Sequence, residues 1–430
     1  MSAPTVSVVV PTRDRCSAVT RLLRALAVEY SAGVQMEVIV VDDGSTDGTV
    51  ASLISAQWPY RLRIVQGGGT GAAVARNAGA RLATGDILLF LDDDVEPESG
   101  LVSAHAAAHM QGDGLVAIGD LPPVIRDPTL LGSTLRAWWG EMQSGIRRPG
   151  HRHTYRDLLS GHFSVRRIQF ERLGGFDERL RCREDYELGY RAMAAGLQFQ
   201  FVPQAVARHH DPTDVAKALR RKRDEGVADV YLLRRHPAIA PTLPLSKPWS
   251  YSRRERLLIA LAWRNRTAGD AMARALAATL GPLQAVKLRW RWVASLETLL
   301  TYHYWRSVAV TVGSPAALQA LLARAETVPQ VPTPIDLAQG LDAAAAVLDS
   351  VRPRAGRFML GTELVGDVAD VPGEEPLRGV HLMPLLATVL RDSYLLALAR
   401  KGRVPTTLAP AAAPMMAAAD QMEGRGATAA

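Results

Sequence analysis

The sequence predicts an α/β protein built on a doubly wound sheet, and three observations lead to this class. Short apolar runs rich in β-branched residues alternate with helical patterns four times in about the first hundred residues. Most residues in each run are apolar, as in buried parallel strands. Right-handed crossovers between such strands place all four carboxyl ends at one edge of the sheet, which is where open α/β sheets bind ligands.

The four repeats set the expected elements. Strands are expected at residues 6–10, 37–41, 62–65 and 87–91, and helices at residues 18–29, 46–54 and 72–82. Pro11 ends the first strand, and Asp42-Asp43-Gly44 follows the second. The third leads into a glycine-rich turn, residues 67–71.

Beyond the fourth strand the pattern is less regular. Further strands are expected at residues 115–119, 162–165, 199–202 and 205–209, with a loop and helix segment at 122–149 and a helix at 184–195. The periodicity is mainly helical from residue 213 to about 325. A proline-rich linker at 328–334 leads to a small α+β unit, with helices at 335–351 and 380–400 and strands at 357–360 and 363–368.

This pattern indicates four parts. They are an α/β domain at residues 1–235, a helical extension at 236–327, a small unit of unknown role at 335–403, and an Ala/Pro-biased tail at 404–430 that we expect to be disordered.

Composition limits the class of protein. The chain has 430 residues, 48% of them hydrophobic and 22% charged, which is typical of a globular protein. Its two cysteines, Cys16 and Cys182, lie far apart and have no metal-ligand spacing, so we expect a reducing compartment. The N-terminus has no signal-peptide pattern, and the apolar windows are too short to cross a bilayer. We therefore expect a cytoplasmic protein.

The positive charge is concentrated in one region. The net charge is +7, yet residues 213–306 alone carry 18 Lys/Arg against 7 Asp/Glu, together with five of the eight tryptophans. Basic side chains with interleaved Trp suit either an anionic interface or a solvated helical face with aromatic core anchors. We expect peripheral contact with an anionic membrane at its inner face, and no nucleic-acid partner.

Three consecutive carboxylates follow the fourth strand. Asp92, Asp93 and Asp94 stand at the expected ligand-binding edge. Their charges repel one another unless a cation or a proton compensates them. The natural compensator is Mg²⁺ or Mn²⁺, which takes oxygen ligands and can hold a phosphate-bearing substrate. The alternative is a simple acidic loop or helix cap.

The order of the motifs resembles a known family. Val-Val-Val-Pro-Thr-Arg-Asp-Arg (8–15), Val-Val-Asp-Asp-Gly-Ser-Thr-Asp-Gly-Thr (40–49), Ala-Arg-Asn-Ala-Gly (75–79) and Phe-Leu-Asp-Asp-Asp (90–94) are similar to those of family 2 glycosyltransferases. Further on come Ser-Gly-His-Phe-Ser-Val-Arg-Arg (160–167), Gly-Gly-Phe-Asp-Glu (174–178) and Arg-Glu-Asp-Tyr-Glu-Leu (183–188). The resemblance covers about residues 5–235. It implies the GT-A fold, a Rossmann-like doubly wound mixed sheet.

The resemblance also implies roles for individual residues. The nucleotide-sugar would be bound by Pro11, Thr12, Arg13, Asp43, Arg76, Asp92, Asp93 and Gly161. Asp94 would be the direct metal ligand, joined by Asp92 and by His209 or its neighbour His210. Asp185 would be the general base, with Glu184 as the other candidate. Trp138 and Trp139 lie where acceptors usually bind in this family, although a hydrophobic plug is the alternative for them.

The chemistry fits these residue types independently. A divalent ion stabilises the charge that develops on a diphosphate leaving group, and a carboxylate near the acceptor hydroxyl removes its proton. One base opposite the leaving group gives inversion. We therefore expect a metal-dependent inverting glycosyltransferase that moves a sugar from a nucleotide-diphospho-sugar to a hydroxyl of a glycan, lipid or secondary metabolite.

Two rival functions remain. One is a sugar-phosphate nucleotidyltransferase, which is disfavoured because no Gly-rich loop with Arg and Lys follows the first strand. The other is a catalytically inactive binding or scaffold subunit, which the presence of all the expected acids disfavours.

Overall fold

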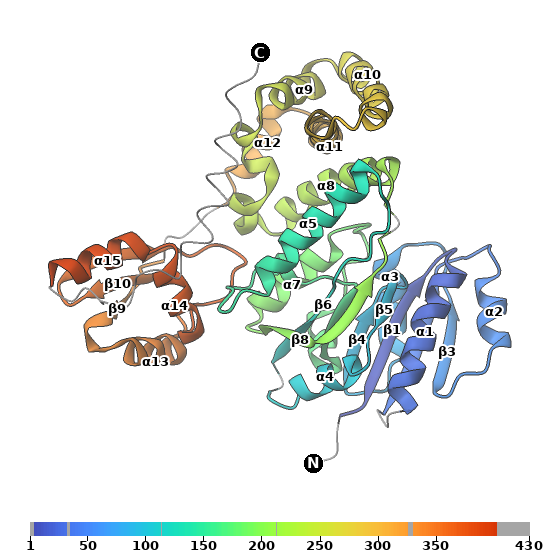
Figure 1. Ribbon diagram of the computed structural model, residues 1–430, viewed down its shortest axis with the longest axis horizontal. Coiled ribbons are helices and arrows are strands. Elements are labelled where there is room, and N and C mark those ends of the chain that lie inside the picture. The colour runs from blue at the N-terminus through green and yellow to red at the C-terminus, as the bar shows by residue number, and fades with distance from the viewer. Residues whose placement is uncertain (1–3, 32–34, 113, 212, 326–329, 402–430) are drawn as a thin grey trace. The chain divides into compact units, whose positions relative to one another are not determined.

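The computed structural model describes residues 4–31, 35–112, 114–211, 213–325 and 330–401 (Figure 1). These residues form two compact units. The first comprises residues up to 329 together with Asp370–Glu375, and the second comprises Gln330–Ala369 and the residues from Pro376 onward. The expected α/β domain and the helices that follow it fall in the first unit. The tail at 404–430 lies outside the described residues, as do Val328 and Pro329 of the expected linker and residues 402–403 of the expected small unit.

One eight-stranded sheet organises the first unit, with the strand order β3-β2-β1-β4-β7-β6-β8-β5. Its strands are β1 (Val6–Thr12), β2 (Met36–Asp42), β3 (Arg61–Gln66), β4 (Ile87–Leu91), β5 (Val95–Pro97), β6 (Leu115–Asp120), β7 (His162–Arg166) and β8 (Gln198–His209). The first four are parallel, whereas β7 runs antiparallel to both β4 and β6. The expected mixed α/β sheet is confirmed.

Helices cover both faces of this sheet. One face packs against α1 (Cys16–Ser31), α2 (Thr49–Ser55) and α4 (Leu101–Ala108), and the other against α3 (Ala72–Leu82), α6 (Arg167–Leu173) and α7 (Glu184–Ala194). The alternation along β1 shows the division, because Val8 packs on the first face and Val9 on the second. The sheet is therefore doubly wound.

The first unit also contains a helical layer. It consists of α5 (Leu130–Ile146), α8 (Val215–Arg235), α9 (Arg253–Arg264), α10 (Arg266–Ala285), α11 (Arg289–Val312) and α12 (Pro315–Leu322), which share one apolar core (Figure 1). Gly226 of α8 packs so closely on α11 that a Cβ there would lie 2.4 Å from the Tyr304 carbonyl oxygen. The two helix backbones thus meet directly.

The second unit is a small α+β fold. Its strands β9 (Thr333–Asp336), β10 (Gly356–Leu360) and β11 (Glu363–Val368) form one sheet, packed with α13 (Leu341–Val351), α14 (Gly379–Ala387) and α15 (Arg391–Arg400). Within the described ranges no individual helix has the length and apolarity to span a membrane. The bent pair α14 and α15, at 83° to each other, meets that test only when taken together.

Four expected elements differ in the structure. The helix expected from residue 46 begins at Thr49, because the Asp47 carboxylate accepts a hydrogen bond from the Thr49 amide and Gly48 adopts a left-handed conformation (φ 81°). The helix expected at 335–351 begins at Leu341, because β9 pairs with β10. The helix expected at 380–400 is two helices that meet at a bend after Pro384. The two strand pieces expected at 199–202 and 205–209 form one strand, β8, with a register shift opposite Gly119.

Candidate active site

The carboxyl ends of β1, β2, β3 and β4 lie at one edge of the sheet because these strands are parallel. The segments that follow the strands carry the residues singled out above. Many of these side chains form hydrogen bonds or ion pairs with one another, and these contacts define the candidate site.

Two arginines pair with the three carboxylates that follow β4. Arg15 Nη1 lies 2.7 Å from Asp93 Oδ1 and 2.8 Å from Asp94 Oδ2. Arg76 Nη2, from α3, lies 2.5 Å from Asp92 Oδ1. The proximity of the carboxylates raises the pKa of both arginines despite their burial. We expected a cation or a proton to compensate these charges and did not single out Arg15, although its position in the motif after β1 was a usable signal.

Arg76 also connects two halves of the edge. Its Nη1 donates to Glu184 Oε1 at 2.8 Å, while its side chain is only 3% exposed. Glu184 and Asp185 begin α7, so one guanidinium joins the acids after β4 to the acids of this helix. We expected Arg76 near the donor's phosphate or ribose, and the structure places it between carboxylates.

Asp93 lies below the surface of the site. It is 5% exposed and accepts hydrogen bonds from Thr12 Oγ1 (2.8 Å) and Arg15. Burial, aided by the charge of Asp94, raises the pKa of Asp93 to about 6. Thr12, expected to contact the nucleoside, is itself buried and committed to Asp93.

Asp94 and His209 are arranged as metal ligands would be. His209 Nε2 lies 3.6 Å from Asp94 Oδ1, and that oxygen is buried without a hydrogen-bond partner. The other candidate, His210, directs its Nε2 to Glu96 Oε2 at 2.8 Å. The geometry therefore favours His209. The unsatisfied oxygen and the imidazole nitrogen fit a divalent cation between them.

Gly161 permits a close approach to Asp92. A Cβ at this position would lie 2.8 Å from Asp92 Oδ2, and the Gly161 carbonyl accepts a hydrogen bond from the Asp92 amide at 3.1 Å. Asp92 keeps 35% of its side chain exposed. Any larger residue at 161 would displace this carboxylate.

Asp43 organises the glycine-rich turn after β3. Its two carboxylate oxygens accept hydrogen bonds from the amides of Thr70 (2.9 Å) and Gly71 (2.8 Å). Pro11 is part of β1, paired with Val41, whereas the Arg13 side chain is 56% exposed. Of these three residues, Arg13 is the one that presents its side chain to solvent at this edge.

Asp185 faces the site from the first turn of α7. Its Oδ1 accepts from the Tyr186 amide at 2.8 Å, and its Oδ2 lies 3.4 Å from the Ser160 amide. Burial and the neighbouring charge of Glu184 raise the pKa of Asp185. Glu184 is more enclosed, at 7% exposure, and is bound to Arg76. Asp185 is thus the better placed of the two to accept a proton.

A buried network holds the start of α7. Arg183, at the N-cap, adopts a left-handed conformation (φ 59°) and pairs with Asp229 of α8 at 3.0 Å. Asp229 is fully buried and accepts a hydrogen bond from the Tyr304 hydroxyl of α11 at 2.7 Å. Helices α8 and α11 therefore fix the residue directly before Glu184 and Asp185. Sequence reasoning missed this network because its members are far apart in the chain.

The two tryptophans differ in environment. Trp139 stacks edge-on with His209 (centroids 4.6 Å apart) and donates from Nε1 to Asp211 Oδ2 at 3.1 Å. Trp138 is 37% exposed. Trp139 thus supports His209, and only Trp138 offers an open ring surface.

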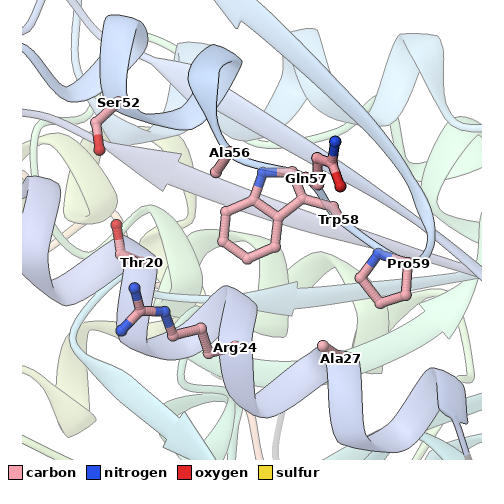
Figure 2. A pocket seen from close by; sticks show the side chains of 8 residues that line it. All are labelled: Thr20, Arg24, Ala27, Ser52, Ala56, Gln57, Trp58 and Pro59. Carbon is pink, nitrogen blue, oxygen red and sulfur yellow. The ribbon is translucent and has the colours of Figure 1, made fainter.

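A separate pocket lies between α1 and the loop after α2. It has a volume of about 280 Å³, and Figure 2 shows the Trp58 indole directed into it, with Arg24 and Thr20 of α1 alongside. None of the candidate site residues lines this pocket.

Comparison with known proteins found similar sequences. Residues 7–174 match the model of "Glycosyl transferase family 2". The chain is 30% identical over 274 residues to the validoxylamine A glucosyltransferase of Streptomyces hygroscopicus subsp. jinggangensis, a match that covers 56% of this chain and 63% of that protein. It is 28% identical over 333 residues to the pre-mycofactocin glycosyltransferase of Mycobacterium tuberculosis, covering 70% of this chain and 65% of that protein. The chain spans slightly less than two thirds of each relative.

Solved structures were also compared. A mannosyltransferase from Pyrobaculum calidifontis, solved with GDP-Man and Mn²⁺, aligns at a TM-score of 0.47 and 22% identity, over 71% of this chain and 88% of that one. Residues 1–349 of S. aureus TarS, solved with UDP-GlcNAc, align at a TM-score of 0.41 and 18% identity. This alignment covers 72% of this chain and 92% of that one.

Replacing Arg76 should destabilise the protein. Arg76→Met leaves the buried Glu184 and the partly exposed Asp92 without their cation, so we expect a loss of about 3–5 kcal/mol in the free energy of unfolding. Urea denaturation in metal-free buffer measures it. Arg81→Met on the same helix is the matched control, because Arg81 is 66% exposed and pairs with an exposed Glu178; its cost should stay below about 1 kcal/mol. Equal costs for the two variants would contradict the bridging role of Arg76.

Proposed function

Because residues 7–174 match the model of the family 2 glycosyltransferases, we propose that this protein transfers a sugar from a nucleotide-diphospho-sugar to a hydroxyl acceptor, with inversion and with a divalent cation. One observation carries the proposal. The unsatisfied Asp94 Oδ1 beside His209 lies at the same edge as Asp185, and Arg76 links the two groups of acids.

Asp94 and His209 are the proposed metal ligands, with Asp92 nearby. Mn²⁺ suits this set because it accepts both carboxylate and imidazole ligands, and Mg²⁺ is the alternative. When bound, the ion neutralises charge on the diphosphate leaving group. Arg15 already compensates Asp93 and the second oxygen of Asp94. Asp94 Oδ1 is therefore the atom left for the ion.

Asp185 is the proposed general base. A base must be ionised and within hydrogen-bond reach of the acceptor hydroxyl. Both hydrogen bonds that Asp185 accepts come from backbone amides, so neither is an ion pair that would strongly reduce its basicity. Its raised pKa makes the carboxylate a better proton acceptor than an ordinary aspartate.

Replacing Asp185 and replacing Asp94 should affect different steps of the reaction. Asp185→Asn should lower the turnover number by about 10²–10⁴-fold and leave donor affinity nearly unchanged, because Asn keeps the size but cannot accept the proton. Asp94→Asn should weaken UDP or GDP binding measured with Mn²⁺.

In wild type, a nucleoside diphosphate at 100 times its dissociation constant should add about 2.7 kcal/mol of stability with Mn²⁺ present.

Four outcomes would contradict parts of this proposal. A thermal shift that persists in EDTA would remove the metal from the proposal. Near-normal turnover of Asp185→Asn would move the base to Glu184. An inactive scaffold subunit would bind donor without Mn²⁺-dependent donor hydrolysis, and a nucleotidyltransferase would instead release pyrophosphate from a nucleoside triphosphate and a sugar phosphate.

The rate should depend on the protonation of Asp185. Burial and Glu184 raise its pKa to about 6, so the carboxylate is protonated, and unable to act as a base, below that pH. We expect the turnover number at saturating donor to fall about tenfold per unit as the pH drops below 6 and to level off above it. Asp93→Asn is the control, since Asp93 has a similar pKa; the profile should persist in it. A flat profile between pH 5 and 7 would contradict the assignment.

We further propose that the protein is cytoplasmic and attaches to anionic membranes through the turn between α10 and α11. Val286 and Trp290 are 71% and 62% exposed there. The Arg291 guanidinium lies 4.9 Å from the Trp290 ring centroid, and Lys287 and Arg289 are exposed beside them. Exposed aromatic and basic side chains together suit the lipid headgroup region.

Vesicle co-sedimentation tests the attachment. Each basic group contributes on the order of 1 kcal/mol at an anionic surface. Replacing Lys287, Arg289 and Arg291 with Gln should therefore reduce recovery with anionic vesicles at low salt by about tenfold or more. The charge-matched control replaces the exposed Arg24, Arg126 and Arg172 with Gln and should retain binding. Equal recovery on neutral and anionic vesicles would leave this turn as an ordinary solvated surface.

A further inference from the structure

Three metal-binding side chains converge outside the site described above. They are His151, His153 and Asp157, in the pattern His-x-His-x3-Asp, on the segment that leads into the short helix η1 (Tyr155–Asp157). One ligand atom from each lies within 4.8 Å of the other two. None of them is a residue of the candidate active site, and no cysteine takes part.

The distances suit a single small cation. His151 Nε2 lies 2.8 Å from Asp157 Oδ2, and His153 Nδ1 lies 3.5 Å from the same oxygen. A tetrahedral zinc ion with bonds of about 2.0–2.2 Å holds its ligand atoms about 3.3 Å apart. The two observed separations bracket that value, and the two imidazole nitrogens lie within 4.8 Å of each other.

His153 supplies an independent sign of a ligand. Its side chain is 7% exposed, and its Nδ1 is buried without a hydrogen-bond partner. A separation of 3.5 Å from Asp157 is too long for a good hydrogen bond. Buried polar atoms in proteins normally have a partner, and His153 Nδ1 has none. A metal ion is a partner that an imidazole nitrogen can bind.

The surroundings favour a positive ion. Glu375 is 4% exposed, and its Oε1 accepts a hydrogen bond from the His153 amide at 2.9 Å. The nearby Arg152 is paired with Glu374 at 2.9 Å. His151 and Asp157 keep about a quarter and a fifth of their side chains exposed, which leaves an entry path from solvent.

We propose that His151, His153 and Asp157 form a second metal site, which takes Zn²⁺ or a similar transition-metal ion with water in the fourth position. Two imidazoles and one carboxylate are a zinc-type ligand set, distinct from the oxygen-rich sets that Mg²⁺ prefers.

The site would brace the segment that enters the active site. Asp157 closes a capping box with Thr154, and Tyr155 donates its amide hydrogen to the Gly373 carbonyl at 2.8 Å. A Cβ on Gly189 of α7 would lie 2.4 Å from the Tyr155 carbonyl oxygen, so η1 packs directly on the helix that carries Asp185. Three residues beyond η1 lies Ser160, whose amide contacts Asp185. The ion would thus stiffen this connection.

Zinc content of the full chain tests the proposal. The test uses the His209→Gln variant as the parent, so that the proposed donor-side site does not contribute. The protein is stripped with EDTA, loaded with ZnCl₂, freed of excess metal by gel filtration and analysed by mass spectrometry. We expect about one zinc ion per chain, and a visible absorption band typical of tetrahedral coordination after loading with Co²⁺ instead.

Matched variants make the result specific. Adding His151→Gln should reduce zinc to below about 0.1 ion per chain and abolish the Co²⁺ band; His151 is partly exposed, so this change leaves the core intact. Adding His303→Gln, which replaces a histidine on α11, should retain both signals. Zinc should also raise the unfolding temperature of the parent and of the His303 control but not of the His151 variant. Equal zinc in the two variants, or less than about 0.1 ion in the parent, would overturn the proposal.

Discussion

The Arg76 guanidinium is the interaction on which the candidate site depends. It is almost fully buried, which is costly for a charge unless partners are close and well oriented. Asp92 and Glu184 provide these partners from opposite sides, and the Phe176 ring lies 5.5 Å away. Because α3 carries the arginine, β4 precedes one acid and α7 carries the other, a single side chain fixes the relation of three elements. Without it, the two acidic groups of the site would repel one another.

Arg15 gives the acids a second internal counterion. Two guanidiniums share three carboxylates, so each acid after β4 has a cationic partner and only Asp94 keeps a buried oxygen unsatisfied. A divalent ion would therefore bind at one defined atom, Asp94 Oδ1 beside His209, and not at an open cluster of negative charge.

The fold was largely predictable because its signals are local. Short, mainly apolar runs identified the four parallel strands, and their order placed the acids at a common edge. The misplaced boundaries at Thr49, Leu341 and Ala387 arose where a side-chain hydrogen bond, a strand pairing or a bend overrode the periodicity. The resemblance to family 2 is confirmed by the family match.

The contacts within the site could not be predicted in the same way. Arg15 lies close to Asp93 although 78 residues separate them, and Arg76 is 108 residues from Glu184. No periodicity encodes such pairings, because they depend on how the elements pack. The roles expected for Thr12 and Arg76 were inferred from the family motif alone, and the structure adds that both side chains are already engaged by acids.

The buried path from Arg183 through Asp229 to Tyr304 has a consequence for how this chain can be divided. A fragment that ended near residue 235, where the family resemblance stops, would lack α11. It would lose the hydroxyl that satisfies Asp229 and the backbone against which Gly226 is closely packed. The apolar side of α8 would then face water, next to the strained residue that precedes the proposed base. The end of the family motifs is therefore not the end of the folded unit. A fragment that keeps these contacts around the proposed base must extend through α11.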